Sequence, residues 1–121
     1  MDPRNTDAFF TRGFIHSQQG RDQLAIDDSS NAITINPADG EAYINRALVY
    51  STLGEYSSTI VDADLVVQVD PTYAKAYLVR ASAHANLGMA TQSQADIDRA
   101  VALGVDRAQA ESNIAGTSLS P

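Results

Sequence analysis

The sequence of 121 residues contains no cysteine and no tryptophan, and it has only two histidines. Without cysteine the chain forms no disulfide, has no thiol nucleophile and offers no thiolate to zinc. Basic residues are also scarce, because eight Lys and Arg stand against 15 Asp and Glu, a net charge of −7. This deficit argues against a nucleic-acid or anionic-membrane surface, since phosphate binding needs clustered Lys and Arg.

Long apolar runs are missing as well. None approaches the roughly 20 residues of a membrane span, and the first residues lack the basic-then-apolar pattern of a secretory signal. These absences leave the compartment unknown, with a cytoplasmic protein as the default expectation, and they predict no direct membrane insertion. With 44% hydrophobic and 19% charged residues, the composition is that of a globular domain.

The most informative feature of the sequence is a repeat with a period of 34 residues. Six columns recur at this spacing: Pro3, Pro37 and Pro71; Phe9, Tyr43 and Tyr77; Arg12, Arg46 and Arg80; Gly20, Gly54 and Gly88; Asp28, Asp62 and Asp96; Ile33, Val67 and Val101. A fixed period of this length predicts an array of similar supersecondary units. We place the three units at residues 6–39, 40–73 and 74–107.

Each unit has the pattern of two helices. In the second unit, Tyr43 and Ala47 start a stripe at helical spacing, Gly54 interrupts it, and apolar residues resume it over residues 60–67. Pro71 then closes the unit, since a proline disfavours helix in the residue before it. The sequence therefore predicts a helix-turn-helix unit that is repeated three times.

The period, the early aromatic, the mid-unit glycine and the closing proline resemble the tetratricopeptide repeat. The pattern covers residues 2–107, with departures: His16 and His84 replace a tyrosine, and the third unit lacks its proline. The resemblance implies an all-α, right-handed α-solenoid of three helix-turn-helix repeats. It also implies a protein–protein interaction module, not an enzyme.

The two ends of the chain carry further expectations. Residues 106–115 predict a C-terminal solvating helix that covers the last repeat, followed by a disordered tail at residues 116–121. Residues 1–5 match the end of a preceding repeat or form an N-terminal cap. Because Phe9, Phe10 and Phe14 make the first helix apolar, two alternatives stay open: a piece cut from a longer array, and a natural start at Met1. A self-associating array, and so a homo-oligomer, is the alternative function.

No catalytic constellation is present in the sequence. It contains no Gly-rich phosphate loop, no G-x-S-x-G and no H-E-x-x-H. His16 and His84 occupy the same repeat position two units apart, about 20 Å at the roughly 10 Å spacing of packed helices, so they do not share a metal. We expect no cofactor and no metal, and we interpret both rings as half-buried parts of the packing stripe.

An arginine and an aspartate recur at equal distances before and after each mid-unit glycine. In an antiparallel hairpin, equal distances from the turn place two side chains at one level. We therefore predict a structural ladder of one Arg–Asp bridge per repeat, with an anion site lined by the arginines as the alternative. The predicted pairs are Arg12 with Asp28, Arg46 with Asp62, and Arg80 with Asp96.

The resemblance further implies that a second stripe on the first helix of each unit lines a concave groove. The positions it assigns to the groove are Phe10, Phe14 and Ser17 in unit one, Glu41, Ile44, Asn45, Leu48 and Ser51 in unit two, and Lys75, Leu78, Ser82 and Asn86 in unit three. The apolar members would form one strip with a polar rim, which is typical of a peptide-binding surface. The alternative is that they pack on neighbouring repeats.

One subclass of these repeats holds a chaperone's C-terminal carboxylate with two Lys, two Asn and one Arg. The matching positions here are Phe10, Phe14, Asn45, Lys75 and Val79, so only Asn45 and Lys75 fit. The resemblance therefore implies a groove for an apolar or amphipathic protein segment, and no chaperone-carboxylate clamp.

Overall fold

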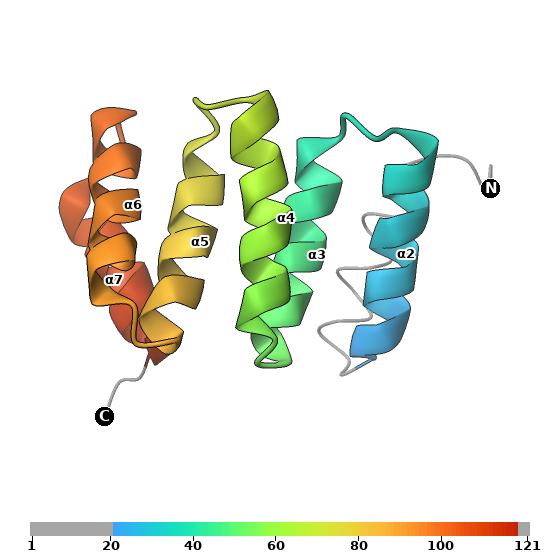
Figure 1. Cartoon of the computed structure of the whole chain (residues 1–121), viewed down its shortest axis with the longest axis horizontal. Helices are drawn as coiled ribbons and strands as arrows, with labels where there is room; N and C mark the ends of the chain where they lie inside the picture. The colour runs from blue at the N-terminus through green and yellow to red at the C-terminus, as the bar shows by residue number, and fades with distance from the viewer. Residues whose placement is uncertain (1–20, 119–121) are drawn as a thin grey trace.

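The structure, a computed structural model, describes residues 21–118 as an array of α-helices without a strand in that range (Figure 1). The helices are α2 (Asp22–Ile35), α3 (Gly40–Thr52), α4 (Tyr56–Val69), α5 (Ala74–Asn86), α6 (Ala90–Ala102) and α7 (Arg107–Ser118). The predicted all-α solenoid is confirmed. The pairs α3–α4 and α5–α6 correspond to the second and third predicted units, which we call the second and third repeats, and α2 falls in the second half of the first predicted unit. Residues 1–20 lie outside the described range.

A glycine in the left-handed conformation ends the first helix of each complete repeat. Gly54 has a φ of 79° and Gly88 has a φ of 77°, values that residues with a Cβ atom rarely adopt. Beyond them, the amide of Glu55 donates to the carbonyl of Tyr50 at 2.8 Å, and Met89 makes the equivalent bond. These bonds satisfy the last carbonyls of the helix and turn the chain back on itself.

The loops between repeats are held by a short polar side chain before the proline. Asn36 accepts from the amide of Ala38 at 3.2 Å, and Asp70 accepts from the amide of Thr72 at 3.0 Å. Since the proline after each of these residues prevents the helix from continuing, the chain makes a tight corner and starts the next repeat.

The largest core cluster lies where three helices meet. Ile44 and Ala47 of α3 pack with Val66 of α4 and with Ala76 and Val79 of α5. The alanines in this cluster are fully buried. Their small side chains let the helices approach closely, and the larger aliphatic side chains fill the space between them.

Hydroxyl groups tie the two helices of each complete repeat together. The Thr59 hydroxyl donates to the carbonyl of Ala47 at 3.2 Å, and the Ser93 hydroxyl donates to the carbonyl of Ala81 at 2.9 Å. Both pairs are 12 residues apart, and both hydroxyl-bearing residues are buried. A polar residue is therefore tolerated at this small-residue position because its one donor is satisfied.

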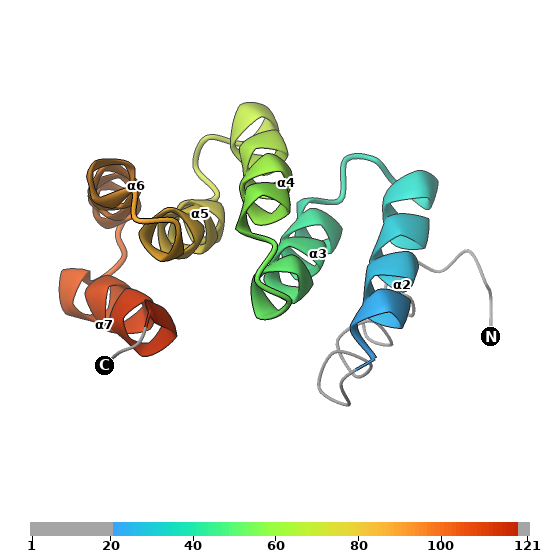
Figure 2. The same ribbon diagram turned by 60° about the horizontal axis from the view of Figure 1, so that its bottom comes forward.

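The array has an inner and an outer side. The first helices contact one another in sequence, α3 with α5 and α5 with α7, whereas among the described helices no contact joins α2 with α4 or α4 with α6. In Figure 2 the helices α4 and α6 lie on one side of the row, and α3 and α7 lie on the other. Helices that touch on one side and separate on the other produce a curved array, concave on the side of α3, α5 and α7.

The last helix begins as predicted and ends later. Asp106 accepts from the amide of Gln109 at 3.0 Å, which caps α7. The helix continues to Ser118, beyond the predicted end at Ala115, so the first half of the predicted tail is helical. Gly116 weakens a helix by only about 0.5–1 kcal/mol and does not by itself stop it.

Within residues 21–118, no helix combines the length and the apolar composition needed to cross a membrane.

Candidate functional site

A groove lies on the concave side, between α3, α5 and α7. It encloses about 300 Å³. Its lining consists of aliphatic side chains, two serines and one lysine: Leu48, Ser51, Lys75, Leu78, Val79, Ser82 and Ile114. The surface is therefore an apolar floor with hydroxyl groups and a single cation at its edge.

Five of the residues predicted for the groove lie together in it: Leu48, Ser51, Lys75, Leu78 and Ser82. They come from two helices that are adjacent in space and separated by α4 in the sequence. Leu48 is 37% exposed, a high fraction for a leucine beside a folded core. Ile114 of α7 joins them, and the sequence did not point to it because its place depends on how the last helix packs.

The structure corrects the prediction for Ile44. This side chain is 1% exposed and belongs to the core between α3, α4 and α5. Successive residues on a helix are about 100° apart, so the groove stripe and the packing stripe are neighbours. The small side chains of Ala47 and Ala76 leave room on the packing side, which the Ile44 side chain fills.

The remaining predicted groove residues of α3 and α5 lie outside the groove lining. Glu41 is exposed in the first turn of α3. Asn86 donates to the carbonyl of Ser82, one turn earlier in its own helix, at 2.9 Å. The Asn45 side chain is partly buried, and its Nδ2 has no hydrogen-bond partner among the described residues. Phe10, Phe14 and Ser17 fall outside the described range.

The arginine of each complete repeat meets the aspartate 16 residues later. Arg46 forms a two-pronged pair with the buried Asp62, with Nη2 at 2.8 Å and Nε at 2.9 Å from the two carboxylate oxygens. Arg80 pairs with Asp96 at 2.7 Å. Hydrogen bonding to these carboxylates raises the pKa of both arginines above its ordinary value. Asp28 is buried, and its predicted partner Arg12 lies outside the described residues.

Each arginine also reaches the preceding repeat, which the sequence analysis did not anticipate. Arg46 donates from Nη1 to the Ser30 hydroxyl at 3.1 Å, and Arg80 donates from Nη1 to Asp64 at 2.7 Å. Ser30 and Asp64 lie 16 residues before their arginines, so the spacing itself contained the signal. The bridge therefore joins the two helices of one repeat and also joins consecutive repeats.

His84 belongs to this network. Its Nδ1 lies 3.0 Å from the second oxygen of Asp96, and its side chain is largely buried. Among the described residues, no group of three or more histidine, aspartate or glutamate side chains is placed to hold a metal ion. The predicted role of His84 as part of the packing stripe agrees with this position. His16 lies outside the described range.

Comparison with solved structures places this architecture among known folds. The chain is similar to the first TPR domain of Spaghetti (RPAP3) bound to the HSP90 peptide SRMEEVD, with a TM-score of 0.84 at 24% identity, over 98% of this chain and 94% of that one. It is also similar to the first TPR domain of human RPAP3, with a TM-score of 0.86 at 24% identity, over 96% of this chain and 91% of that one. A third similar structure is the TPR domain of Arabidopsis OM64, with a TM-score of 0.81 at 22% identity over 93% of each chain.

The chain has the tetratricopeptide-repeat fold. No protein-family model matches its sequence, and no curated protein matches it. At 24% identity or less, the likeness to these solved structures establishes the fold of the chain alone. The chain's own residues build two features: the concave groove between α3, α5 and α7, and the arginine bridges within the pairs α3–α4 and α5–α6.

Proposed function

We propose that this chain is a protein–protein interaction module that binds an apolar or amphipathic segment of a partner protein in its concave groove. The observation that carries the proposal is the meeting of Leu48, Leu78 and Ile114 from three helices on one concave surface. Apolar side chains that gather in an open groove are a binding-site signal, because monomeric proteins rarely expose contiguous apolar surface without a use for it.

The groove lining also defines the polarity of the segment. Lys75 is exposed in the first turn of α5 and has no ion-pair partner among the described residues. Ser51 and Ser82 add two hydroxyl groups to the lining. A segment that places two apolar side chains on the leucines and an acidic side chain near Lys75 satisfies all of these groups.

The solved domain of Spaghetti (RPAP3) binds an HSP90 peptide that ends in EEVD. In this chain the position of one clamp donor is taken by Val79, which packs in the core between α3 and α5. Asn45 and Lys75 are the two clamp residues present. Two donors hold a terminal carboxylate poorly when three others are replaced by apolar side chains, so we propose recognition through side chains and not through a chain terminus.

The groove alone supports only modest affinity. Burying about 250 Å² of apolar surface gains about 6 kcal/mol at about 25 cal/mol per Å². Association costs at least about 4 kcal/mol, so a dissociation constant in the micromolar range or weaker is expected from this surface.

The proposal is tested by replacing both groove leucines with glutamate. Leu48→Glu with Leu78→Glu introduces two charges onto the apolar floor, so partner binding is lost while the helical content is kept. Retention of lysate proteins by the wild type and the variant, identified by mass spectrometry, measures the effect after circular dichroism has verified the fold.

The matched control is Leu53→Glu with Leu87→Glu. These leucines occupy equivalent positions at the turns that follow α3 and α5, and they are similarly exposed. The control retains the partner if the groove binds it. A partner held equally by the groove variant and the wild type would refute the groove, and retention of nothing except further copies of this chain would favour the self-associating array.

A further inference from the structure

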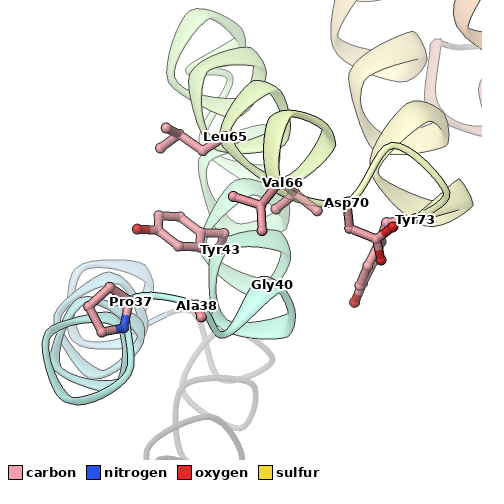
Figure 3. A pocket seen from close by; sticks show the side chains of 9 residues that line it. Pro37, Ala38, Gly40, Tyr43, Leu65, Val66, Asp70 and Tyr73 are labelled. Carbon is pink, nitrogen blue, oxygen red and sulfur yellow. The ribbon is translucent and has the colours of Figure 1, made fainter.

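A second pocket lies on the outer side of the array, away from the concave groove. It encloses about 140 Å³ where the loop after α2, the start of α3 and the end of α4 meet. Figure 3 shows the Tyr43 ring between Leu65 and Pro37, with Val66, Asp70 and Tyr73 at the other side of the view. Its walls are apolar except for Asp70 and the two tyrosine hydroxyls.

An apolar stripe leads from this pocket along the outer face of α4. Val61, Leu65 and Val69 follow one another at four-residue spacing and are 57%, 39% and 75% exposed. The same positions carry Asp27, Asn31 and Ile35 in the first repeat and Ala95, Arg99 and Leu103 in the third. Neither of those repeats has three large aliphatic side chains in a row, so the stripe is particular to the second repeat and is not a property of the fold.

The third repeat carries a cation at the equivalent place. There Arg99 replaces Leu65, and its guanidinium lies 5.9 Å from the centre of the Tyr77 ring. Arg80 lies at 5.5 Å from the same ring. Tyr43 receives the matching contact from Arg46 at 5.7 Å, but no second guanidinium of a described residue lies over it. Among the described residues, the ring of Tyr43 therefore lacks a counterpart of Arg99, the second arginine that lies over Tyr77 in the third repeat.

The second-repeat pocket also differs from the equivalent place in the third repeat by its negative charge. Asp70 lines it, Asp39 and Glu41 lie at the start of α3 beside it, and none of the three forms an ion pair with a described residue. Burial and the charges of these carboxylates raise the pKa of the Tyr73 phenol, which lines the pocket. The equivalent positions in the third repeat are Tyr73, Lys75 and Gly104, which carry no negative charge.

We propose that this outer pocket binds an arginine side chain of a partner protein, presented by an amphipathic segment whose apolar residues lie along Val61, Leu65 and Val69. The guanidinium lies over the Tyr43 ring, as Arg99 lies over Tyr77, and the carboxylate of Asp70 in the lining, with the charges of Asp39 and Glu41 nearby, favours a cation there. Both the acidic charge at this pocket and the arginine at the same place one repeat later favour this occupant.

The first test uses small probes and ¹H–¹⁵N NMR of the whole chain. N-acetylarginine amide shifts the amides of Gly40, Tyr43 and Asp70, and N-acetylcitrulline amide, which has the same shape without charge, binds about 10-fold more weakly. Equal binding of the two, or equal binding of N-acetyllysine amide, contradicts the assignment to arginine. Shifts of these amides on raising the protein concentration without a probe point to a second copy of the chain and overturn it too.

Variants that exchange features between repeats sharpen the test. Leu65→Arg supplies the pocket with its own guanidinium and abolishes probe binding. Glu41→Gln with Asp70→Asn keeps the shape and removes charge, so binding weakens without a change in fold. Arg99→Leu opens the equivalent place in the third repeat, where the rim is not acidic, and gains no binding. Undiminished binding by Leu65→Arg overturns the proposal.

The apolar stripe is tested with an amphipathic helical peptide that carries one central arginine between leucines. It binds more tightly than N-acetylarginine amide, and Val61→Gln, at a stripe residue outside the pocket lining, reduces that advantage while leaving the amino-acid probe unaffected. If the stripe variant binds the peptide as the wild type does, the stripe is not part of the site. Because the concave groove is a separate surface, Leu48→Glu with Leu78→Glu changes none of these results, and the two proposals fail independently.

Discussion

The second and third repeats share one backbone plan and differ in how their equivalent side chains are used. Ile44 and Leu78 occupy the same repeat position, yet Ile44 is buried in the core and Leu78 lines the concave groove. Arg46 has one carboxylate and one hydroxyl as partners, whereas Arg80 has two carboxylates. Equivalent positions in two repeats therefore share their place on the backbone, and the contacts of each side chain depend on the repeat that packs beside it.

This difference makes each repeat the control for the other. An effect that follows from the shared fold appears at both equivalent positions. An effect that follows from a particular neighbour appears at only one of them.

The largest difference is expected at the position that Ile44 and Leu78 share. Ile44→Ala removes a fully buried side chain and leaves a cavity, so it lowers the free energy of unfolding by about 3 kcal/mol. Leu78→Ala truncates a partly exposed side chain and lowers it by about 1 kcal/mol. Urea unfolding followed by circular dichroism measures both, and equal losses would show that the two positions are packed alike.

A smaller difference is expected between the two aspartates of the ladder. Asp62→Ala leaves the guanidinium of Arg46 with Ser30 alone and lowers the free energy of unfolding by about 3 kcal/mol. Asp96→Ala costs about 2 kcal/mol, because Arg80 keeps its bridge to Asp64 and the remaining loss includes the His84 contact. The reverse order, measured by the same unfolding experiment, would mean that the inter-repeat contact contributes nothing.

The double variant Arg46→Asp with Asp62→Arg separates pairing from burial. It recovers part of the stability lost by either single change if the two side chains bind each other directly. A double variant no more stable than the worse single one would show that they do not.

The smallest effect concerns the corner before each repeat. Hydrogen bonds from the Thr72 hydroxyl and amide lower the pKa of Asp70, whereas the first corner has Asn36 and Ala38 in the equivalent places. Thr72→Ala removes the hydroxyl, so the pKa of Asp70 rises toward its ordinary value. A lowered pKa stabilises the folded state above the ordinary pKa of an aspartate, and this contribution is lost as the pH falls through the folded value. The variant therefore lacks the contribution at neutral pH, and its stability falls less on acidification.

The titration of the Asp70 carboxyl carbon by NMR checks this. An unchanged midpoint in the variant would assign the lowered pKa to the backbone amide alone.

The fold was predictable because the same helix-turn-helix pattern recurs three times at 34-residue spacing. The turns follow from Gly54 and Gly88, which adopt the positive φ that other residues avoid. The pairing of Arg46 with Asp62 follows from the hairpin, since both residues are equally far along the chain from the same glycine.

Contacts between repeats were not predictable in the same way. The bond from Arg80 to Asp64 depends on how one hairpin stacks on the next, and the burial of Ile44 depends on the small side chains that face it from α5. The outer pocket has Leu65 in its lining, at a position where the first repeat has Asn31 and the third has Arg99. A periodic pattern describes what the units share, so features that distinguish one unit from another require the packed structure.

The most direct test of the concave groove is methyl NMR of the chain with a bound partner segment. We predict that the methyl signals of Leu48, Leu78 and Ile114 shift together on binding, while those of Leu53 and Leu87 stay in place. Shifts confined to Leu53, Leu87 or the outer face of α4, with the three groove methyls unchanged, would contradict it.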